Sequence, residues 1–342
     1  NFSKRFWQII IGPWLLHFVE SFYDRYMCIK KAIEEFYPFS TFYLDPKHFI
    51  TPYDTSEFIE LYVNDYYNLQ LYTQILTKFN IAGSVRSASG CEAPPPNIKR
   101  NSMKSLLKKL LGLVSKRITL SRQYVLWDMY LSNKHLVRYL IYSKFRAFCV
   151  LYHEYPKSVI HSKAKENQWR LNLGSLPPVD EFTAILISAL EVNFPTLYLE
   201  DFDTYMGKVI SGIKQFPKVI FSSTGWFFNE EFKFFSAYCM EKGSKLAGFQ
   251  HGGLYGAAKW MPVEEHEIEI TDRFFSWGWT KKNQPKVRPL ANPKISYLYY
   301  KGKNIRRMQN QQLLFVGNAH PRYLYRFFSV PVAEMYDEYL DW

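Results

Sequence analysis

The chain has 342 residues, of which 47% are hydrophobic and 18% aromatic, and its formal net charge is +12. A chain of this length can fill one large core or two ordinary ones, so we expect a globular protein. The positive charge would suit nucleic acid, an anionic membrane or a phosphate-bearing substrate. The sequence contains no zinc-finger spacing, RNP-type strand or arginine-rich tail, which argues against nucleic acid.

The four cysteines are far apart, without the C-x-x-C spacing of a zinc site or a redox pair. They are Cys28, Cys91, Cys149 and Cys239. We therefore expect reduced structural thiols and no metal site among them. We also expect no cofactor and a cytoplasmic protein that is at most peripheral to the inner membrane. The best apolar run, residues 9–19, is too short to cross a bilayer, and no signal peptide is visible.

Helical patterns dominate the first 120 residues. Residues 5–37 carry apolar side chains at helical spacing and Pro38 ends the pattern, which predicts a long buried helix. Asp54 and Glu57 have capping-box spacing and open a second helical stretch that reaches about residue 79. Residues 83–96 are rich in turn-forming residues, which predicts a loop or a flexible insertion.

Residues 103–118 form a basic amphipathic pattern, with leucines and other apolar residues on one helical face and lysines over much of the rest. Two interpretations stay open. The helix packs on the core as an ordinary surface helix, or it lies on a membrane and is attracted to anionic lipid.

From residue 124, short β-type runs alternate with helical runs, which is typical of a parallel sheet covered by helices. The predicted strands are 124–131, 146–152, 218–223, 244–250 and 273–279. The predicted helices are 135–142, 179–192, 229–240 and 262–270, with Ser132 as a cap and Gly243 as a helix stop. The fold class is therefore α/β, with a Rossmann-like parallel sheet flanked by helices.

The domain prediction follows from these patterns. Residues 1–279 form an amino-terminal Rossmann-like domain with an insertion at about 83–120. Residues 280–311 lack periodicity and are predicted to be a linker. Residues 312–342 open with a strand-like run, 312–317, and are predicted to start a second Rossmann-like domain that is incomplete. Since the sequence begins with Asn1 rather than Met, we interpret it as a fragment cut at both ends.

The segment GFQHGGLYG (248–256) follows a predicted strand at the carboxyl end, where ligands bind in open α/β sheets. His251 is the candidate catalytic base, because imidazole transfers protons near neutral pH. A histidine that only caps the strand is the alternative. The glycines Gly252, Gly253 and Gly256 permit close backbone approach to a phosphate or sugar.

Two neighbours of His251 have open roles. Gln250 is either a ligand contact or a last ladder residue. Tyr255 either stacks on a sugar ring or belongs to the core. Further along the chain, Glu267 is the second catalytic candidate, as a base or as a group that orients His251, although a solvated helix start explains most of the nearby glutamates. Asp272 and Arg273 follow it and are candidate substrate contacts.

Other strand ends supply further candidate substrate-binding residues. Ser223 and Thr224 end the strand 218–223, where their hydroxyls either hold a ligand or cap a helix. His320 and Arg322 follow the strand-like run 312–317, and Arg322 would pair with a phosphate or stay an ordinary surface arginine. The sequence lacks G-x-x-x-x-G-K-[ST] and G-x-G-x-x-G, which argues against a P-loop and a standard dinucleotide site.

Six segments together resemble a family of transferases encoded in bacterial surface-polysaccharide and nucleotide-sugar gene clusters. They are IIGPWL (10–15) with YDRY (23–26), SSTGWFFNEEFK (222–233), GFQHGGLYG (248–256), EEHEIEITDRFFSWGW (264–279) and PRYLYRF (321–327). By position, the family-like residues outside the candidates already named are Trp14, Asp24, Arg25, Trp277 and Trp279.

The resemblance implies a GT-B-like fold and transfer of a sugar from a nucleotide-activated donor, without an essential metal. Its implied substrates are a nucleotide sugar and a glycan or lipid-linked glycan acceptor of O-antigen or capsule synthesis. Peripheral contact with an anionic membrane is also expected. Two alternatives stay open: a polyol-phosphate transferase that uses a CDP-glycerol-type donor, and a non-catalytic glycan-binding or scaffold protein.

Overall fold

The chain divides into two compact units that interleave along the sequence. The computed structural model describes residues 1–86, 103–150, 168–302, 322–324 and 326–327. Unit 1 comprises residues 1–10, 100–155 and 208–320, and unit 2 comprises residues 11–99, 156–207 and 321–342. The long predicted helix is confirmed as α1 (Lys4–Phe36), which begins in unit 1 and continues in unit 2.

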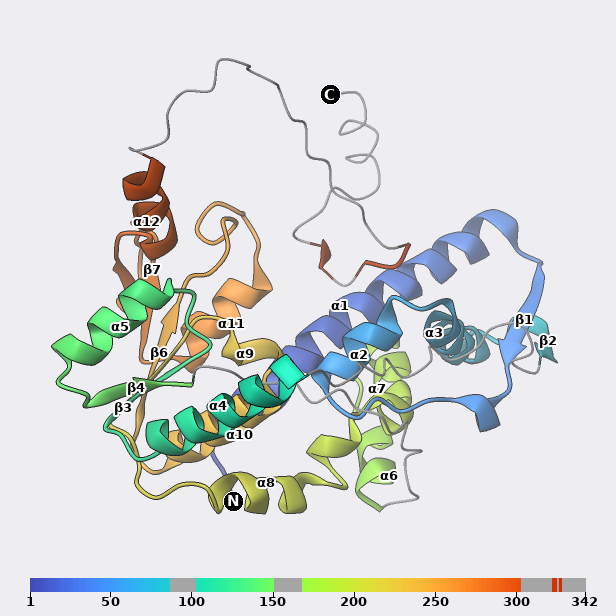
Figure 1. The fold of residues 1–342 in the computed structure, drawn as a ribbon. Coiled ribbons are helices and arrows are strands. Elements are labelled where there is room, and N and C mark those ends of the chain that lie inside the picture. The colour runs from blue at the N-terminus through green and yellow to red at the C-terminus, as the bar shows by residue number, and fades with distance from the viewer. Residues whose placement is uncertain (87–102, 151–167, 303–321, 325, 328–342) are drawn as a thin grey trace. The chain divides into compact units, whose positions relative to one another are not determined.

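Unit 1 is an α/β unit built around one sheet (Figure 1). After the start of α1, its elements are α4 (Met103–Thr119), β3 (Tyr124–Trp127), α5 (Asn133–Tyr142), β4 (Ala147–Cys149), β5 (Val219–Ser222), α9 (Gly225–Phe228), α10 (Glu230–Glu241), β6 (Lys245–Phe249), α11 (Pro262–Ile270), β7 (Arg273–Ser276), β8 (Val287–Pro289) and α12 (Pro293–Gly302). The helix α8 (Phe202–Ile210) crosses from unit 2 into unit 1.

The sheet of unit 1 has six parallel strands in the order β4-β3-β5-β6-β7-β8. Trp127 pairs with Ser222, and Phe249 with Phe275, so the strands end together at one edge. We call this edge the carboxyl edge and the opposite one the amino edge. The fold class predicted from the sequence, a Rossmann-like parallel sheet flanked by helices, is confirmed.

Helices cover both faces of this sheet. Leu136 and Leu140 of α5 pack on a core cluster that includes Leu126 of β3. Trp127, the next residue, contacts Phe232 and Phe235 of α10, with ring centroids 5.6 Å apart in each pair. Because successive side chains of a strand point to opposite faces, α5 and α10 lie on opposite faces of the sheet. We call these the α5 face and the α10 face.

Local sequence signals position most of these elements. Ser132 accepts a hydrogen bond from the His135 amide and caps α5, as predicted. Gly243 ends α10 with a φ of +96°, a conformation that favours glycine. Within the predicted linker, residues 287–302 contain β8 and α12. The short β8 buries only Val287, which explains why its sequence shows no alternation.

Unit 2 is mainly helical. Its elements are β1 (Ser40–Leu44), a 3-10 turn (Pro46–His48), α2 (Thr55–Tyr62), α3 (Asp65–Lys78), β2 (Ala82–Arg86), α6 (Gln168–Gly174), α7 (Glu181–Asn193) and a second 3-10 turn (Thr196–Tyr198). Asp54 caps α2 through the Glu57 amide, as its spacing predicts. Asn64 caps α3, and this second cap divides the helical stretch that the sequence predicted as one.

The family-like residues of α1 belong to the interior of unit 2. Trp14 is fully buried and stacks on Phe18. Arg25 is also buried, donates a hydrogen bond to Asn68, pairs with Asp24 and lies 5.0 Å from the ring centre of Tyr62. These contacts assign Trp14 and Arg25 to the packing of this unit.

The predicted amphipathic helix is confirmed as α4. Among its described side chains, those of Ser115 and Thr119 are buried, whereas those of Leu110 and Val114 in the apolar stripe are exposed. Within the described residues, no helix is both long enough and apolar enough to cross a membrane. The loop prediction for 83–96 is wrong for residues 83–86, which belong to β2 and pair with β1, and the rest of that segment lies outside the described residues. The strand-like run 312–317 lies entirely outside them.

Candidate functional site

The carboxyl edge of the sheet contains a topological switch point. From β3 the chain continues to β4 on one side, and β5 lies on the other side. In doubly wound sheets, ligands bind in the crevice outside the carboxyl ends of the strands at such a point. The loops after β3, β5, β6 and β7 all meet there, because the sheet is parallel and in register.

Asp128 organises the switch point, and the sequence analysis missed it. It follows β3 with a φ of +49°, which is uncommon for a residue other than glycine. Its carbonyl accepts hydrogen bonds from the amides of Ser223 and Thr224, and its carboxylate accepts one from Asn229 at 2.6 Å. The signal in the sequence was the acidic residue inside the predicted strand 124–131, which marks where β3 ends.

Ser223 and Thr224 contribute to this switch point. The Ser223 hydroxyl is buried and accepts a hydrogen bond from the Tyr130 amide at 3.1 Å. The Thr224 hydroxyl donates to the Asp128 carbonyl at 3.2 Å, and Thr224 precedes α9 without a side-chain cap bond. Both hydroxyls therefore tie the loop after β5 to the loop after β3.

A small hollow of about 20 Å³ lies at this edge. It is lined by Met129, Tyr130, Leu131, Ser223, Phe249, Gln250, Phe275, Ser276, Trp277, Leu290 and Ala291. The rings of Phe249 and Phe275 are 4.7 Å apart. Phe249 and Phe221 lie on the same side of the sheet, since Phe221 packs against the α5 cluster and its ring is 6.2 Å from that of Phe249. The hollow therefore opens on the α5 face, with aromatic walls and a polar rim.

Gln250 holds the loop that follows β6. Its side-chain oxygen accepts hydrogen bonds from the Trp277 amide at 2.7 Å and the Trp279 indole at 2.8 Å. Its side-chain nitrogen donates to the Gly252 carbonyl at 2.7 Å. Its own backbone amide continues the ladder to Phe275. The buried Gln250 amide thus joins the loops after β6 and β7, and the family-like Trp277 and Trp279 are its partners.

His251 emerges from the same strand end, beside two other predicted residues. Its side chain is 26% exposed, and Nδ1 is 4.0 Å from Oε1 of the fully buried Glu267. The Tyr255 hydroxyl donates to Glu267 Oε1 at 3.1 Å and lies 3.3 Å from His251 Nε2 and 3.5 Å from Nδ1. The structure therefore brings an imidazole that solvent reaches, a phenol and a buried carboxylate together.

The positions of Tyr255 and Glu267 follow from packing on the α10 face. Tyr255 is buried and stacks on Phe274, with ring centroids 5.9 Å apart and nearly parallel planes. Phe274 and Phe275 are adjacent in β7, so they point to opposite faces. We call His251, Tyr255 and Glu267 the His251 cluster. This cluster lies on the α10 face, and the aromatic hollow lies on the α5 face at the same strand ends. Gln250 lies at the boundary, because it lines the hollow and precedes His251.

The glycines of the loop have different roles. Gly256 has a φ of +73°, and a Cβ added to it would approach the Trp279 ring to 2.6 Å, so both conformation and space require glycine. Its amide donates to the Glu264 carboxylate, which also binds Lys281 at 3.1 Å. Gly253 is exposed, and a Cβ there would meet only open space. A Cβ on Gly252 would lie 3.3 Å from the Tyr255 ring.

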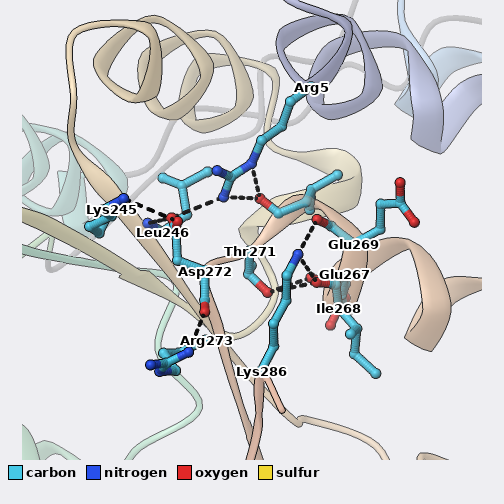
Figure 2. Close-up of polar contacts among 11 residues, drawn as sticks. Arg5, Lys245, Leu246, Glu267, Ile268, Glu269, Thr271, Asp272, Arg273 and Lys286 are labelled. Atoms are coloured by element: carbon cyan, nitrogen blue, oxygen red, sulfur yellow. Dashed lines mark hydrogen bonds and ion pairs between the residues drawn. The ribbon is translucent and has the colours of Figure 1, made fainter. Parts of the chain in front are cut away.

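Asp272 and Arg273 lie at the amino edge, where β7 begins, and Figure 2 shows their polar contacts. His251 follows β6 at the other edge of the sheet. Asp272 accepts hydrogen bonds from the Leu246 amide at 2.9 Å and the Arg5 guanidinium at 3.0 Å, and Lys245 is 3.5 Å away. Burial acts to raise the pKa of Asp272, but these hydrogen bonds and positive charges outweigh it and hold the pKa below its usual value. The substrate contact of Asp272 and Arg273 stays a prediction. Such a contact would lie at the amino edge and not at the His251 cluster.

The two remaining candidates follow the sheet in sequence. Arg322 belongs to unit 2, where its exposed side chain lies 3.5 Å from the exposed Asp65 carboxylate. Surface pairs of this kind contribute little to stability. His320 lies outside the described residues.

The fold and the carboxyl edge define the class of the protein: a Rossmann-like α/β protein whose candidate site lies beyond the strand ends. The whole chain, residues 1–342, matches the model described as the LIC12162 family transferase, so the chain belongs to this transferase family. The search of curated proteins and the search of solved structures give no match. The protein is therefore an enzyme of the transferase class.

Proposed function

We propose that this transferase moves a sugar from a nucleotide-activated donor to a hydroxyl of a glycan or lipid-linked glycan acceptor in bacterial surface-polysaccharide synthesis. The family membership supports the transferase chemistry. A GT-B-like architecture, in which unit 1 supplies the acceptor side, is part of the proposal. The observation that carries it is the partly exposed His251 imidazole at the carboxyl edge, with a buried carboxylate beside it.

In the proposed reaction His251 acts as the general base. One imidazole nitrogen accepts the proton of the acceptor hydroxyl while that oxygen forms a bond to the anomeric carbon of the donor. The bond from the anomeric carbon to the phosphate oxygen breaks, and its electron pair leaves with the nucleoside diphosphate. The exposed backbone at Gly253 is open enough to approach the departing phosphate.

Glu267 and Tyr255 are positioning residues in this proposal. The Glu267 carboxylate is buried and lies 4.0 Å from the ring, where its charge stabilises the imidazolium that forms when His251 takes the proton. The Tyr255 hydroxyl holds one oxygen of that carboxylate at 3.1 Å. The aromatic hollow on the α5 face would receive the apolar face of a sugar ring.

A donor screen tests the proposal. Purified protein is incubated with UDP-, GDP-, CDP- and dTDP-sugars and with a CDP-alditol, each with glycan and lipid-linked glycan acceptors, and free nucleotide is measured. Release of a nucleoside diphosphate that depends on the acceptor is the expected result. Consumption of the CDP-alditol alone, with release of CMP, would assign polyol-phosphate transfer instead. Glycan binding without nucleotide release from any donor would favour a non-catalytic module.

A further inference from the structure

The solvent side of α5 carries an unusual set of exposed apolar residues. Leu136 and Leu140 anchor the helix on the core. The large apolar side chains that project away from the sheet are between 53% and 83% exposed, and they are Val137, Tyr139, Ile141, Tyr142 and Phe145. A contiguous exposed apolar surface on a soluble protein usually marks an interaction site.

Positive charge is interleaved with these residues. Lys134, Arg138, Lys144 and Arg146 are exposed, and residues 129–150 contain no Asp or Glu. Within the described part of the chain, none of these four cations forms an ion pair. Arg138 and Tyr142 are four residues apart, as are Val137 and Ile141, so cations and apolar groups share one exposed helix surface.

The turn after α5 has a strained backbone and places the exposed Phe145 next to the helix. Lys144 and Phe145 both have positive φ, at +51° and +57°. Their amides bind the carbonyls of Ile141 and Leu140 and close the helix end, a position where glycine is the usual residue. Backbone strain of this kind is retained where it serves a function. Here it holds the exposed Phe145 beside the cations.

We propose that this surface, comprising residues 134–146, docks the protein on an anionic phospholipid membrane. Lysine and arginine bind the headgroups, tyrosine rings suit the interface, and Val137, Ile141 and Phe145 enter the acyl boundary. Nucleic acid would leave the aliphatic side chains unused. A second copy meeting this surface across a two-fold axis would bring the four cations against their equivalents, which is unfavourable.

The position of this surface agrees with the proposed function without depending on it. Residues 129–131 line the aromatic hollow, and Ser132 then caps α5. A membrane bound to α5 would therefore lie close to the hollow, where a lipid-linked acceptor would be within reach. Docking is measured without any donor or acceptor, so its failure and the failure of the transferase proposal are distinguishable.

Vesicle co-sedimentation tests the docking. The purified chain is mixed with vesicles of phosphatidylcholine alone or of phosphatidylcholine with phosphatidylglycerol, at low and high salt. We expect binding to the anionic vesicles only, weakened by salt. Lys134→Glu with Arg138→Glu should lower the affinity about tenfold or more, because each juxtamembrane cation contributes on the order of a fivefold gain. Val137→Ser with Ile141→Ser should weaken binding about tenfold through lost apolar immersion.

The control is Leu176→Ser with Val179→Ser, which removes exposed apolar side chains next to the carboxylates of Asp180 and Glu181. This variant should bind vesicles like the unaltered protein.

A strain-relief variant separates docking from folding. Phe145→Gly should keep or raise the Tm, because glycine adopts positive φ freely, yet it should weaken vesicle binding. The proposal would be overturned if the charge-reversal variant bound anionic vesicles like the unaltered protein. Equal binding to neutral and anionic vesicles would also overturn it. So would binding to duplex DNA that vesicles do not compete away, and so would a dimer in solution that both α5 variants abolish.

Discussion

The two edges of the sheet in unit 1 use polar residues in opposite ways. At the amino edge, Asp272 is surrounded by Arg5, Lys245 and the Leu246 amide, and Lys286 donates to backbone carbonyls at the end of α11. Each of these groups is committed to a partner within the chain. At the carboxyl edge, the partly exposed His251 imidazole lies 4.0 Å from the buried Glu267 carboxylate, and an aromatic hollow lies at the same strand ends.

Polar residues at the two ends of the strands are therefore not equivalent. Both Asp272 and His251 adjoin strands, and both belong to the segments that resemble the transferase family. The His251 and Asp272 side chains are both 26% exposed, so solvent access does not separate the two edges. The difference is that the loops after β3, β5, β6 and β7 meet at the carboxyl edge, which is where doubly wound sheets bind ligands. We therefore propose that the amino edge serves stability and that the carboxyl edge serves chemistry, and the variants below test this proposal.

Gln250→Ala should have the largest effect on stability. The buried amide binds the Trp277 amide, the Trp279 indole and the Gly252 carbonyl, which would all lose their partner. We expect the free energy of unfolding to fall by about 2–4 kcal/mol, measured by urea denaturation. Turnover should fall as well, because the loop that carries His251 loses its anchor. The exposed Gln284→Ala is the matched control, and an equal loss in both variants would contradict the anchoring role of Gln250.

Asp272→Asn should have a smaller effect, confined to stability. Loss of the charged acceptor should lower the free energy of unfolding at neutral pH by about 1–2 kcal/mol. The folded-state pKa of Asp272 lies below its ordinary value, so its contribution is present above that ordinary value and is lost as the pH falls through the folded-state pKa. The difference between the two proteins should therefore shrink in acid. A difference that grew as the pH fell would contradict this account.

Much of unit 1 could be predicted from local patterns. The helix signals at Ser132 and Gly243, and the alternation of short apolar runs with helices, are properties of neighbouring residues and survive in the structure. The same holds for the placement of His251 at a strand end. The sequence does not distinguish Glu267 from the glutamates around it, because the packing of α11 decides which carboxylate points inward.

The rest depends on long-range packing that local patterns do not encode. The strand β8 is three residues long and is defined by its pairing with β7, so its sequence resembled a linker. Asp128 became a central residue of the switch point only through its bonds to Ser223, Thr224 and Asn229, about a hundred positions away. The division into interleaved units also requires contacts between distant segments. Conversely, the sequence of α5 has the pattern of an ordinary amphipathic helix, and only the structure shows how much of its apolar surface is exposed.

The central claim is that the imidazole at the carboxyl edge takes part in the reaction while the amino edge does not. The most direct test compares initial rates of nucleotide release for the unaltered protein, His251→Ala and Asp272→Asn, with the folded fraction of each measured by circular dichroism. We predict a loss of about a hundredfold or more for His251→Ala at an unchanged Tm, and a rate per folded molecule within about threefold of the unaltered protein for Asp272→Asn. A His251→Ala protein that kept its full rate would contradict the account.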